Sequence, residues 1–212
     1  MGKESLTQRF VDKLAAQPLT FDALRWVLEA GYRGEKEVLR REGLLDAPSV
    51  LDLGCGTGAM APSFDPRRYL GVDINRRYVD WARRTKPAHR FEAMDGSRLN
   101  LPDEGFDAVF IGGVIHHLPD EAALGMLREA RRVVKPAGLF LMWEDVPTRS
   151  GGNWIGRMVH RLDEGEHIRA ERHYLDLVSL VFGPTRHYAM SSGVCDYLVV
   201  VWRGGGNHAH VF

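Results

Sequence analysis

The stretch Val-Leu-Asp-Leu-Gly-Cys-Gly-Thr-Gly at residues 50–58 decides the fold of this 212-residue chain. Its apolar, β-favouring start predicts a strand, and the glycines at alternate positions predict a tight turn where that strand ends. Glycine tolerates a positive φ there and lets a ligand approach the backbone closely. We therefore expect a strand whose carboxyl end contacts a bound molecule.

One side chain in this stretch separates two kinds of ligand. Gly54, Gly56 and Ala59 also fit the loose Gly-x-Gly-x-x-Gly/Ala pattern of dinucleotide-binding loops, which face a pyrophosphate. Asp52, two residues before the first glycine, would repel phosphate and suits an ammonium-bearing ligand better. Asp52 and the third glycine, Gly58, therefore disfavour a nicotinamide-dependent oxidoreductase, which stays open as a rival.

Length and composition favour one soluble, cytoplasmic domain with a substantial core. Lys plus Arg and Asp plus Glu number 28 each, so no global basic field points to nucleic acid. Cys55 and Cys195 are expected to be reduced thiols, and His residues at uneven spacing predict no metal site. Nowhere do eighteen apolar residues run together, and we expect no membrane partner.

Acidic and polar residues follow the predicted strands one after another. Strands are expected at residues 69–74, 89–96, 106–111 and 139–143, with helices at 76–83 and 121–134 between them. In an open parallel sheet the carboxyl ends meet at one edge, where ligands bind. The side chains expected there, besides the glycine loop, are Asp73, Asp95, Gly112, His116, His117, Glu144 and Asp145.

Residues 48–146 resemble the class I S-adenosylmethionine-dependent methyltransferases, in the small-molecule, methyltransferase-11-like branch. Residues 50–58 match the family's first motif, hydrophobic-x-Asp/Glu-x-Gly-x-Gly-x-Gly, with no departure, and Lys-Pro-Ala-Gly at 135–138 matches its stop before a strand. The resemblance implies a Rossmann-like, doubly wound α/β fold. Its seven-stranded sheet would be mostly parallel, with a C-terminal antiparallel hairpin and helices on both faces.

We expect a single methyltransferase domain over residues 1–212. Its parts are an N-terminal helical lid (1–45, with helices near 4–16, 21–28 and 35–41), the S-adenosylmethionine-binding core (46–146), an acceptor-side insertion (147–182, with helices near 154–160 and 174–182), the terminal hairpin (183–203) and a flexible tail (204–212). Pro62 limits the helix after the glycine loop to a short or irregular piece at 60–64.

The resemblance implies S-adenosylmethionine as cofactor, S-adenosylhomocysteine as its product, and a set of residues that hold it. The methionine part would lie on the glycine loop, the ribose on Asp73 and the adenine beside Asp95. The whole cofactor set is Asp52, Gly54, Cys55, Gly56, Thr57, Gly58, Asp73, Ile74, Asp95, Gly96, Gly112, Tyr32 and Arg33.

Several of these residues have an ordinary structural alternative. Tyr32 and Arg33 are candidates for the ligand carboxylate or the substrate, or else plain turn residues. An ionised carboxylate accepts both hydroxyls of a ribose, which suits Asp73, although an Asp at this point can also cap a helix. Asp95 with Gly96 is also a strong turn former.

The candidate catalytic residues are His117, His116, Glu144 and Asp145. A histidine titrates near neutrality and can take a proton from a hydroxyl or amine, or it can pack beneath the loop and bond a carbonyl. Glu144 and Asp145 either bind or deprotonate the acceptor, or they cap the next loop. Further along, Arg169 and His167 either face an anionic acceptor or belong to a solvated helix face.

The sequence thus predicts transfer of a methyl group from S-adenosylmethionine to an oxygen, nitrogen or carbon of a small molecule, by in-line displacement. A catalytically silent scaffold or sensor with the same fold is the alternative. A nucleic-acid methyltransferase is disfavoured by the balanced charge and by the lack of an Asn/Asp-Pro-Pro-aromatic stretch. The acceptor and the oligomeric state are left open.

Overall fold

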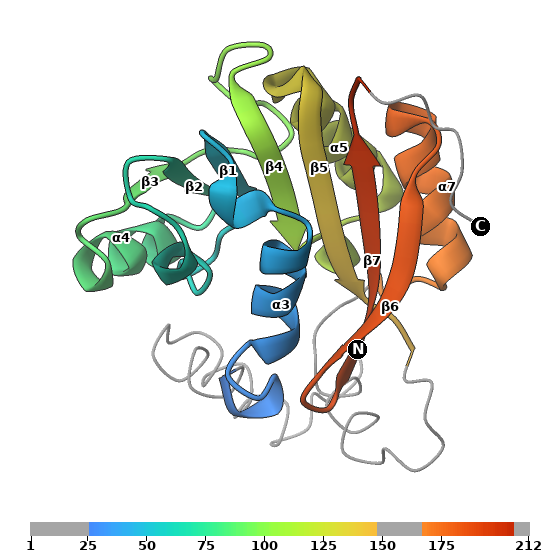
Figure 1. Cartoon of the computed structure of the whole chain (residues 1–212), viewed down its shortest axis with the longest axis horizontal. Coiled ribbons are helices and arrows are strands. Elements are labelled where there is room, and N and C mark those ends of the chain that lie inside the picture. Colours follow the sequence, from blue (N-terminus) through green and yellow to red (C-terminus); the bar gives the residue numbers. More distant parts are fainter. Residues whose placement is uncertain (1–25, 148–166, 206–212) are drawn as a thin grey trace, which may run out of the picture.

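The structure is a computed structural model that describes residues 26–147 and 167–205 (Figure 1). The predicted helix near 4–16, most of the one near 21–28, the helix near 154–160 and most of the tail lie outside these residues. None of the helices in the two described ranges is long and apolar enough to cross a membrane.

A seven-stranded sheet forms the centre of the molecule, in the order β3-β2-β1-β4-β5-β7-β6. β1 to β5 are parallel, whereas β7 runs antiparallel to both β5 and β6. This confirms the predicted fold, including the terminal hairpin. The strands are β1 (Val50–Leu53), β2 (Tyr69–Asp73), β3 (Arg90–Ala93), β4 (Phe106–Gly112), β5 (Val134–Asp145), β6 (Arg186–Ser192) and β7 (Cys195–Arg203).

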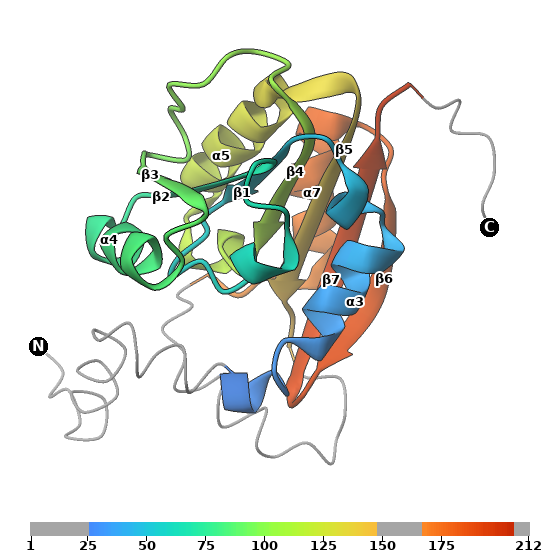
Figure 2. The same cartoon turned by 60° about the vertical axis from the view of Figure 1, so that its left-hand side comes forward.

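Helices cover both faces of the sheet, because the mostly apolar strands must be buried on each side. Figures 1 and 2 show α3 (Arg33–Arg41) and α4 (Arg76–Thr85) on one face, and α5 (Asp120–Val133) and α7 (Glu171–Phe182) on the other. Each pair packs its apolar stripe into its own core cluster. Figure 2 also shows α3 alongside the β6–β7 hairpin, which closes one end of that face.

The order of strands reverses between β1 and β4, which pair with each other although β2 and β3 come between them in the chain. Connections after β1 and β4 therefore leave in opposite directions and open a crevice at the carboxyl ends of these strands. The glycine loop begins there. The connection after it contains only a short 3-10 helix (Ala61–Ser63) that begins beside Pro62, as the sequence predicted.

β5 differs from its prediction at its start. The Lys-Pro-Ala-Gly segment 135–138 follows the end of α5 as expected, but it lies inside the strand and not ahead of it. The register passes from Phe106 opposite Val134 to Ala108 opposite Leu139, so the segment bulges out of the ladder. Pro136 has no N–H to donate, which makes a bulge its natural place in a strand.

Candidate functional site

A cavity of about 380 Å³ lies at the carboxyl ends of the central strands. Its walls come from the glycine loop, the ends of β2, β4 and β5, the start of α4, the loop after β4 and the start of α3. The lining residues are Tyr32, Glu35, Asp52, Gly54, Cys55, Gly56, Thr57, Ala59, Met60, Asp73, Ile74, Asn75, Tyr78, Phe110, Gly112, Gly113, Val114, His117, Leu118 and Trp143. Nine of the predicted cofactor residues and one predicted catalytic residue are among them.

The glycine loop has a shape that side chains would prevent. Gly54 has φ of 85°, and a Cβ on it would lie 2.5 Å from Val114 Cγ2. Gly58 has φ of 75°, and a Cβ there would lie 2.7 Å from the Phe91 ring. Gly58 does not line the cavity, so its glycine serves the packing of the loop against the sheet. A Cβ on Gly56 would meet nothing within 4 Å, so at that position the backbone is open to a ligand.

Asp52 lines the cavity while its side chain is almost fully buried. The Tyr69 hydroxyl donates a hydrogen bond of 2.5 Å to Asp52 Oδ2. Burial raises the pKa of Asp52 to about 7, with the Asp73 carboxylate adding to the rise and the Tyr69 bond opposing it. A cation beside this carboxyl would favour its charged form. The position therefore suits a positively charged ligand group.

Asp73 ties the end of β2 to the glycine loop. Its Oδ2 accepts a hydrogen bond from the Gly56 amide at 2.8 Å, and its Oδ1 accepts one from the Asn75 amide at 2.7 Å. Burial raises the pKa of Asp73. Each carboxylate oxygen has a second lone pair, so both can still accept from a ligand. Asn75, and not Asp73, is the N-cap of α4.

Apolar and aromatic side chains make the rest of the wall. Ile74, beside Asp73, lines the cavity and is 73% exposed. On the far side the Trp143 and Phe110 rings stack with centroids 5.4 Å apart. A Cβ on Gly112 would lie 2.3 Å from the Trp143 ring, so this glycine makes room for the indole.

Asp95 and Gly96 do not line the cavity. Asp95 is exposed, and its Oδ1 accepts hydrogen bonds from the amide and the hydroxyl of Ser97, at 2.8 and 2.7 Å. These bonds lower the pKa of Asp95. The geometry is that of the Asp-Gly turn, the alternative raised by the sequence.

Glu144 holds the loop that follows β4. It is fully buried and accepts hydrogen bonds from the amides of Val114, Ile115 and His116 at 3.0, 2.8 and 3.3 Å. His116 Nδ1 lies 2.8 Å from Glu144 Oε2, and His116 Nε2 lies 3.9 Å from an Asp145 oxygen. Of the four candidate catalytic residues, only His117 lines the cavity, whereas Glu144 bonds the loop that carries it.

Arg169 also forms hydrogen bonds with the loop that follows β4. Its side chain is 5% exposed, and its guanidinium donates to the carbonyl oxygens of Ile115 and Leu118 and to Asp120. The His167 amide donates to the His116 carbonyl at 3.0 Å. The prediction that Arg169 faces an anionic acceptor does not match these contacts, because its guanidinium group is already bonded to the loop and to Asp120. For the His167 side chain the same expectation stays a prediction.

Of the two residues predicted at the start of α3, Tyr32 and Arg33, only Tyr32 lines the cavity. Tyr32 is buried, lines the cavity and adopts φ of 60°, whereas Arg33 is exposed and does not line it. The sequence missed Glu35, which lies in the first turn of α3 and also lines the cavity. The signal in the sequence is the spacing: Glu35 precedes Val38 and Leu39 by three and four residues, which puts it on the same buried face of the helix.

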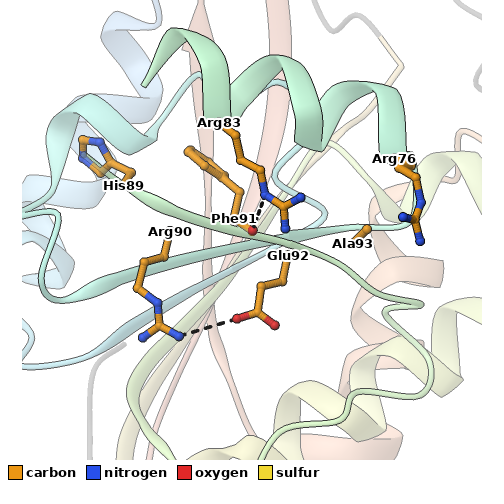
Figure 3. A pocket seen from close by; sticks show the side chains of 7 residues that line it. All are labelled: Arg76, Arg83, His89, Arg90, Phe91, Glu92 and Ala93. Carbon is orange, nitrogen blue, oxygen red and sulfur yellow. Dashed lines mark hydrogen bonds and ion pairs between the residues drawn. The ribbon is translucent and has the colours of Figure 1, made fainter. Parts of the chain in front are cut away.

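A second, shallower hollow lies on the outer edge of the sheet, beside β3 and α4 (Figure 3). It is lined by Arg76, Arg83, His89, Arg90, Phe91, Glu92 and Ala93, none of which lines the cavity. Figure 3 shows Arg83 bonded to the Phe91 carbonyl, at 3.0 Å, and Arg90 paired with Glu92, at 3.5 Å. The glycine loop is not part of this hollow.

Comparison with known proteins agrees with this arrangement. Residues 51–142, which include the glycine loop, Asp73 and Gly112, match the family model for the methyltransferase domain. Over this segment the chain carries a methyltransferase domain, similar to those of the class I S-adenosylmethionine-dependent methyltransferases. The match ends within β5, so the cavity residues of this methyltransferase chain that come from α3 lie outside the matched segment.

Relatives of this methyltransferase include a sterol 24-C-methyltransferase from Aspergillus fumigatus, 29% identical over 66% of this chain and 37% of the relative. A demethylmenaquinone methyltransferase from Staphylococcus saprophyticus is 31% identical over 51% of this chain and 49% of the relative. The chain thus spans less than half the length of these relatives. An S-adenosylmethionine-dependent methyltransferase structure from Aquifex aeolicus has a TM-score of 0.62 at 19% identity, covering 92% of this chain and 97% of that one, which shows the fold alone.

Proposed function

We propose that this chain binds S-adenosylmethionine in the cavity and transfers its methyl group to a small-molecule acceptor. The observation that carries the proposal is the convergence of Asp52, the open backbone at Gly56 and the Asp73 carboxylate on one cavity at the strand-order reversal. The names of the two relatives, a sterol and a demethylmenaquinone methyltransferase, support a small-molecule acceptor.

The residues present fit the chemistry of this cofactor. Asp52 would face the ammonium group, and the loop backbone at Gly56 would lie under the methionine chain. Asp73 would accept the ribose hydroxyls through the lone pairs that its two backbone bonds leave open. Ile74 and Tyr78 would cover the base. The adenine role of Asp95 and Gly96 stays a prediction, because these residues lie outside the cavity lining.

When bound, S-adenosylmethionine supplies a methyl group on a positively charged sulfur, and this sulfur is the group that the acceptor's nucleophile displaces in line. The chain's contribution is to hold the acceptor at the correct distance and angle, which is the larger part of catalysis for such a step. His117 lines the cavity and would accept a proton from a hydroxyl or amine acceptor. Glu144 and Arg169 would act through the loop that carries His117, by fixing its position.

Calorimetric titration of the full chain with S-adenosylmethionine, with S-adenosylhomocysteine and with a reduced nicotinamide dinucleotide tests the binding step. We expect saturable binding of the first two and none of the third. Absence of binding by a protein shown to be folded by circular dichroism would remove the proposal. Binding without transfer of the methyl group to any acceptor in a broad panel would favour the silent scaffold or sensor instead.

A further inference from the structure

We propose that Glu35 and three aromatic side chains form a subsite for an amine group of the methyl acceptor. This inference rests on the proposed function and adds the chemical class of the substrate. It arises from α3, which no family match covers. Glu35 at the start of α3, Phe110 on β4 and Trp143 on β5 line the same cavity.

Glu35 is a buried carboxyl group with one oxygen left over. The residue is 1% exposed and lines the cavity, and its Oε2 lies 2.6 Å from Ser192 Oγ on β6. Its Oε1 is buried and has no hydrogen-bond partner among the residues that the structure describes. A donor from a ligand would satisfy this buried acceptor once the carboxyl group turns toward the cavity that Glu35 lines.

The contacts of Ser192 indicate which oxygen of Glu35 holds a proton. Ser192 Oγ lies 2.8 Å from the Glu29 carbonyl oxygen as well as 2.6 Å from Glu35 Oε2, and it accepts from the Gly34 amide. A hydroxyl group has one proton and can donate to only one of the two oxygens. When it donates to the carbonyl, the contact with Oε2 requires a proton on Glu35 itself. The Glu35 carboxyl group also shares a side-chain hydrogen bond with Glu29.

Charge around Glu35 favours the same state. Burial raises the pKa of Glu35 to about 8, and the Glu29 carboxylate adds to the rise, so the group is mainly protonated at neutral pH. An ammonium group bound beside it would favour the charged form and release the proton to solvent. The other titratable groups that line this cavity are Asp52, Asp73, Cys55, Tyr32, Tyr78 and His117, so its described lining contains three carboxyl groups and neither Lys nor Arg.

Aromatic rings complete the subsite. Tyr32, Phe110 and Trp143 line the same cavity and are each at most 6% exposed. Aromatic faces attract ammonium groups, and more strongly when water is excluded. A carboxyl group next to stacked rings therefore selects an aryl or alkyl amine over a carboxylate of the same shape, which would meet like charge.

The test uses full-length protein saturated with S-adenosylhomocysteine, so that the donor site is filled before the acceptor probe is added. Phenethylamine, 2-phenylethanol and 3-phenylpropanoate are titrated by calorimetry at pH 7 in two buffers with different ionisation enthalpies. We expect the amine to bind at least about tenfold more tightly than the carboxylate and to release about one proton per site. E35Q should weaken amine binding about tenfold, abolish the proton release and leave the alcohol unchanged.

E37Q is the matched control, because Glu37 lies on the same helix, is exposed and bonds Arg40. Equal affinity for amine and carboxylate, or no binding of the amine at millimolar concentration, would overturn the inference. So would an E35Q variant, folded by circular dichroism, that loses affinity for S-adenosylhomocysteine and not for the amine, because Glu35 would then belong to the donor site. If wild-type protein does not bind S-adenosylhomocysteine at all, the proposed function fails first.

Discussion

Removal of the Glu144 carboxylate is the sharpest test of how the cavity loop is held. Glu144 is fully buried and accepts from three backbone amides, of Val114, Ile115 and His116, at 2.8–3.3 Å, and its Oε2 lies 2.8 Å from His116 Nδ1. Glu144→Ala leaves these donors buried without an acceptor. At about 1–3 kcal/mol for each unsatisfied donor, with water able to enter and satisfy some of them, we expect a loss of about 3–5 kcal/mol of folding free energy.

Glu144→Gln separates a positioning role from a catalytic one. Its amide keeps one acceptor oxygen but turns an NH₂ group toward the remaining donors, so we expect about half of the alanine effect. Urea unfolding followed by circular dichroism measures both variants, with exposed Glu121 on α5 changed to Gln as the control, for which less than about 1 kcal/mol is expected.

The affinity of the cavity for S-adenosylmethionine should fall together with the folding free energy. Because Val114 and His117 line it, loosening of the loop should weaken binding of S-adenosylmethionine in both variants in proportion to the lost stability. A Glu144→Gln protein as stable as wild type, with normal cofactor affinity and no methyl transfer, would refute this reasoning. That result would return Glu144 to the role of a base acting on the acceptor.

Three further predictions follow from single contacts. Asp73→Ala should weaken S-adenosylmethionine binding by about 1.5–3 kcal/mol for each lost ribose hydrogen bond, measured by calorimetry with Asp65→Ala as a control; unchanged affinity would contradict the ribose role. Gly54→Ala should lower the free energy of unfolding by about 2–4 kcal/mol and Tm by several degrees in a thermal melt, because residue 54 has φ of 85° and the new Cβ would lie 2.5 Å from Val114 Cγ2. A wild-type Tm would show that the loop has another shape. The pKa of Glu35 is about 8 in the folded chain and about 4.5 in the unfolded chain, so the free energy of unfolding should fall as pH rises from about 4.5 to 8, by up to about 1.4 kcal/mol per pH unit. Glu35→Gln should flatten this slope in urea titrations, and an equal slope in both proteins would contradict the burial argument.

Much of the fold followed from the sequence because its signals are local and repeat. The run into Gly54 predicted a strand and a turn, and the later strands and helices lie where apolar spacing put them. The exception at 135–138 depends on a bulge in the pairing of β4 with β5, and this pairing cannot be predicted from the sequence of either strand alone.

The site was predicted where residues act through the backbone and missed where side-chain direction decides. Gly56 and Asp73 follow from the glycine loop and the strand end. Glu144 also sits at a strand end, but it turns toward the amides of a neighbouring loop, which only tertiary packing determines. Glu35 was missed because a charged residue in an Arg-rich helix usually faces solvent, and here the helix turns it inward.

A crystal structure of the full chain with S-adenosylhomocysteine tests the central claim most directly. The account predicts the ribose hydroxyls within about 2.6–3.2 Å of the Asp73 carboxylate and the amino acid tail over Gly56, near Asp52. A nucleoside bound away from Asp73, or a diphosphate resting on the glycine loop, would contradict it.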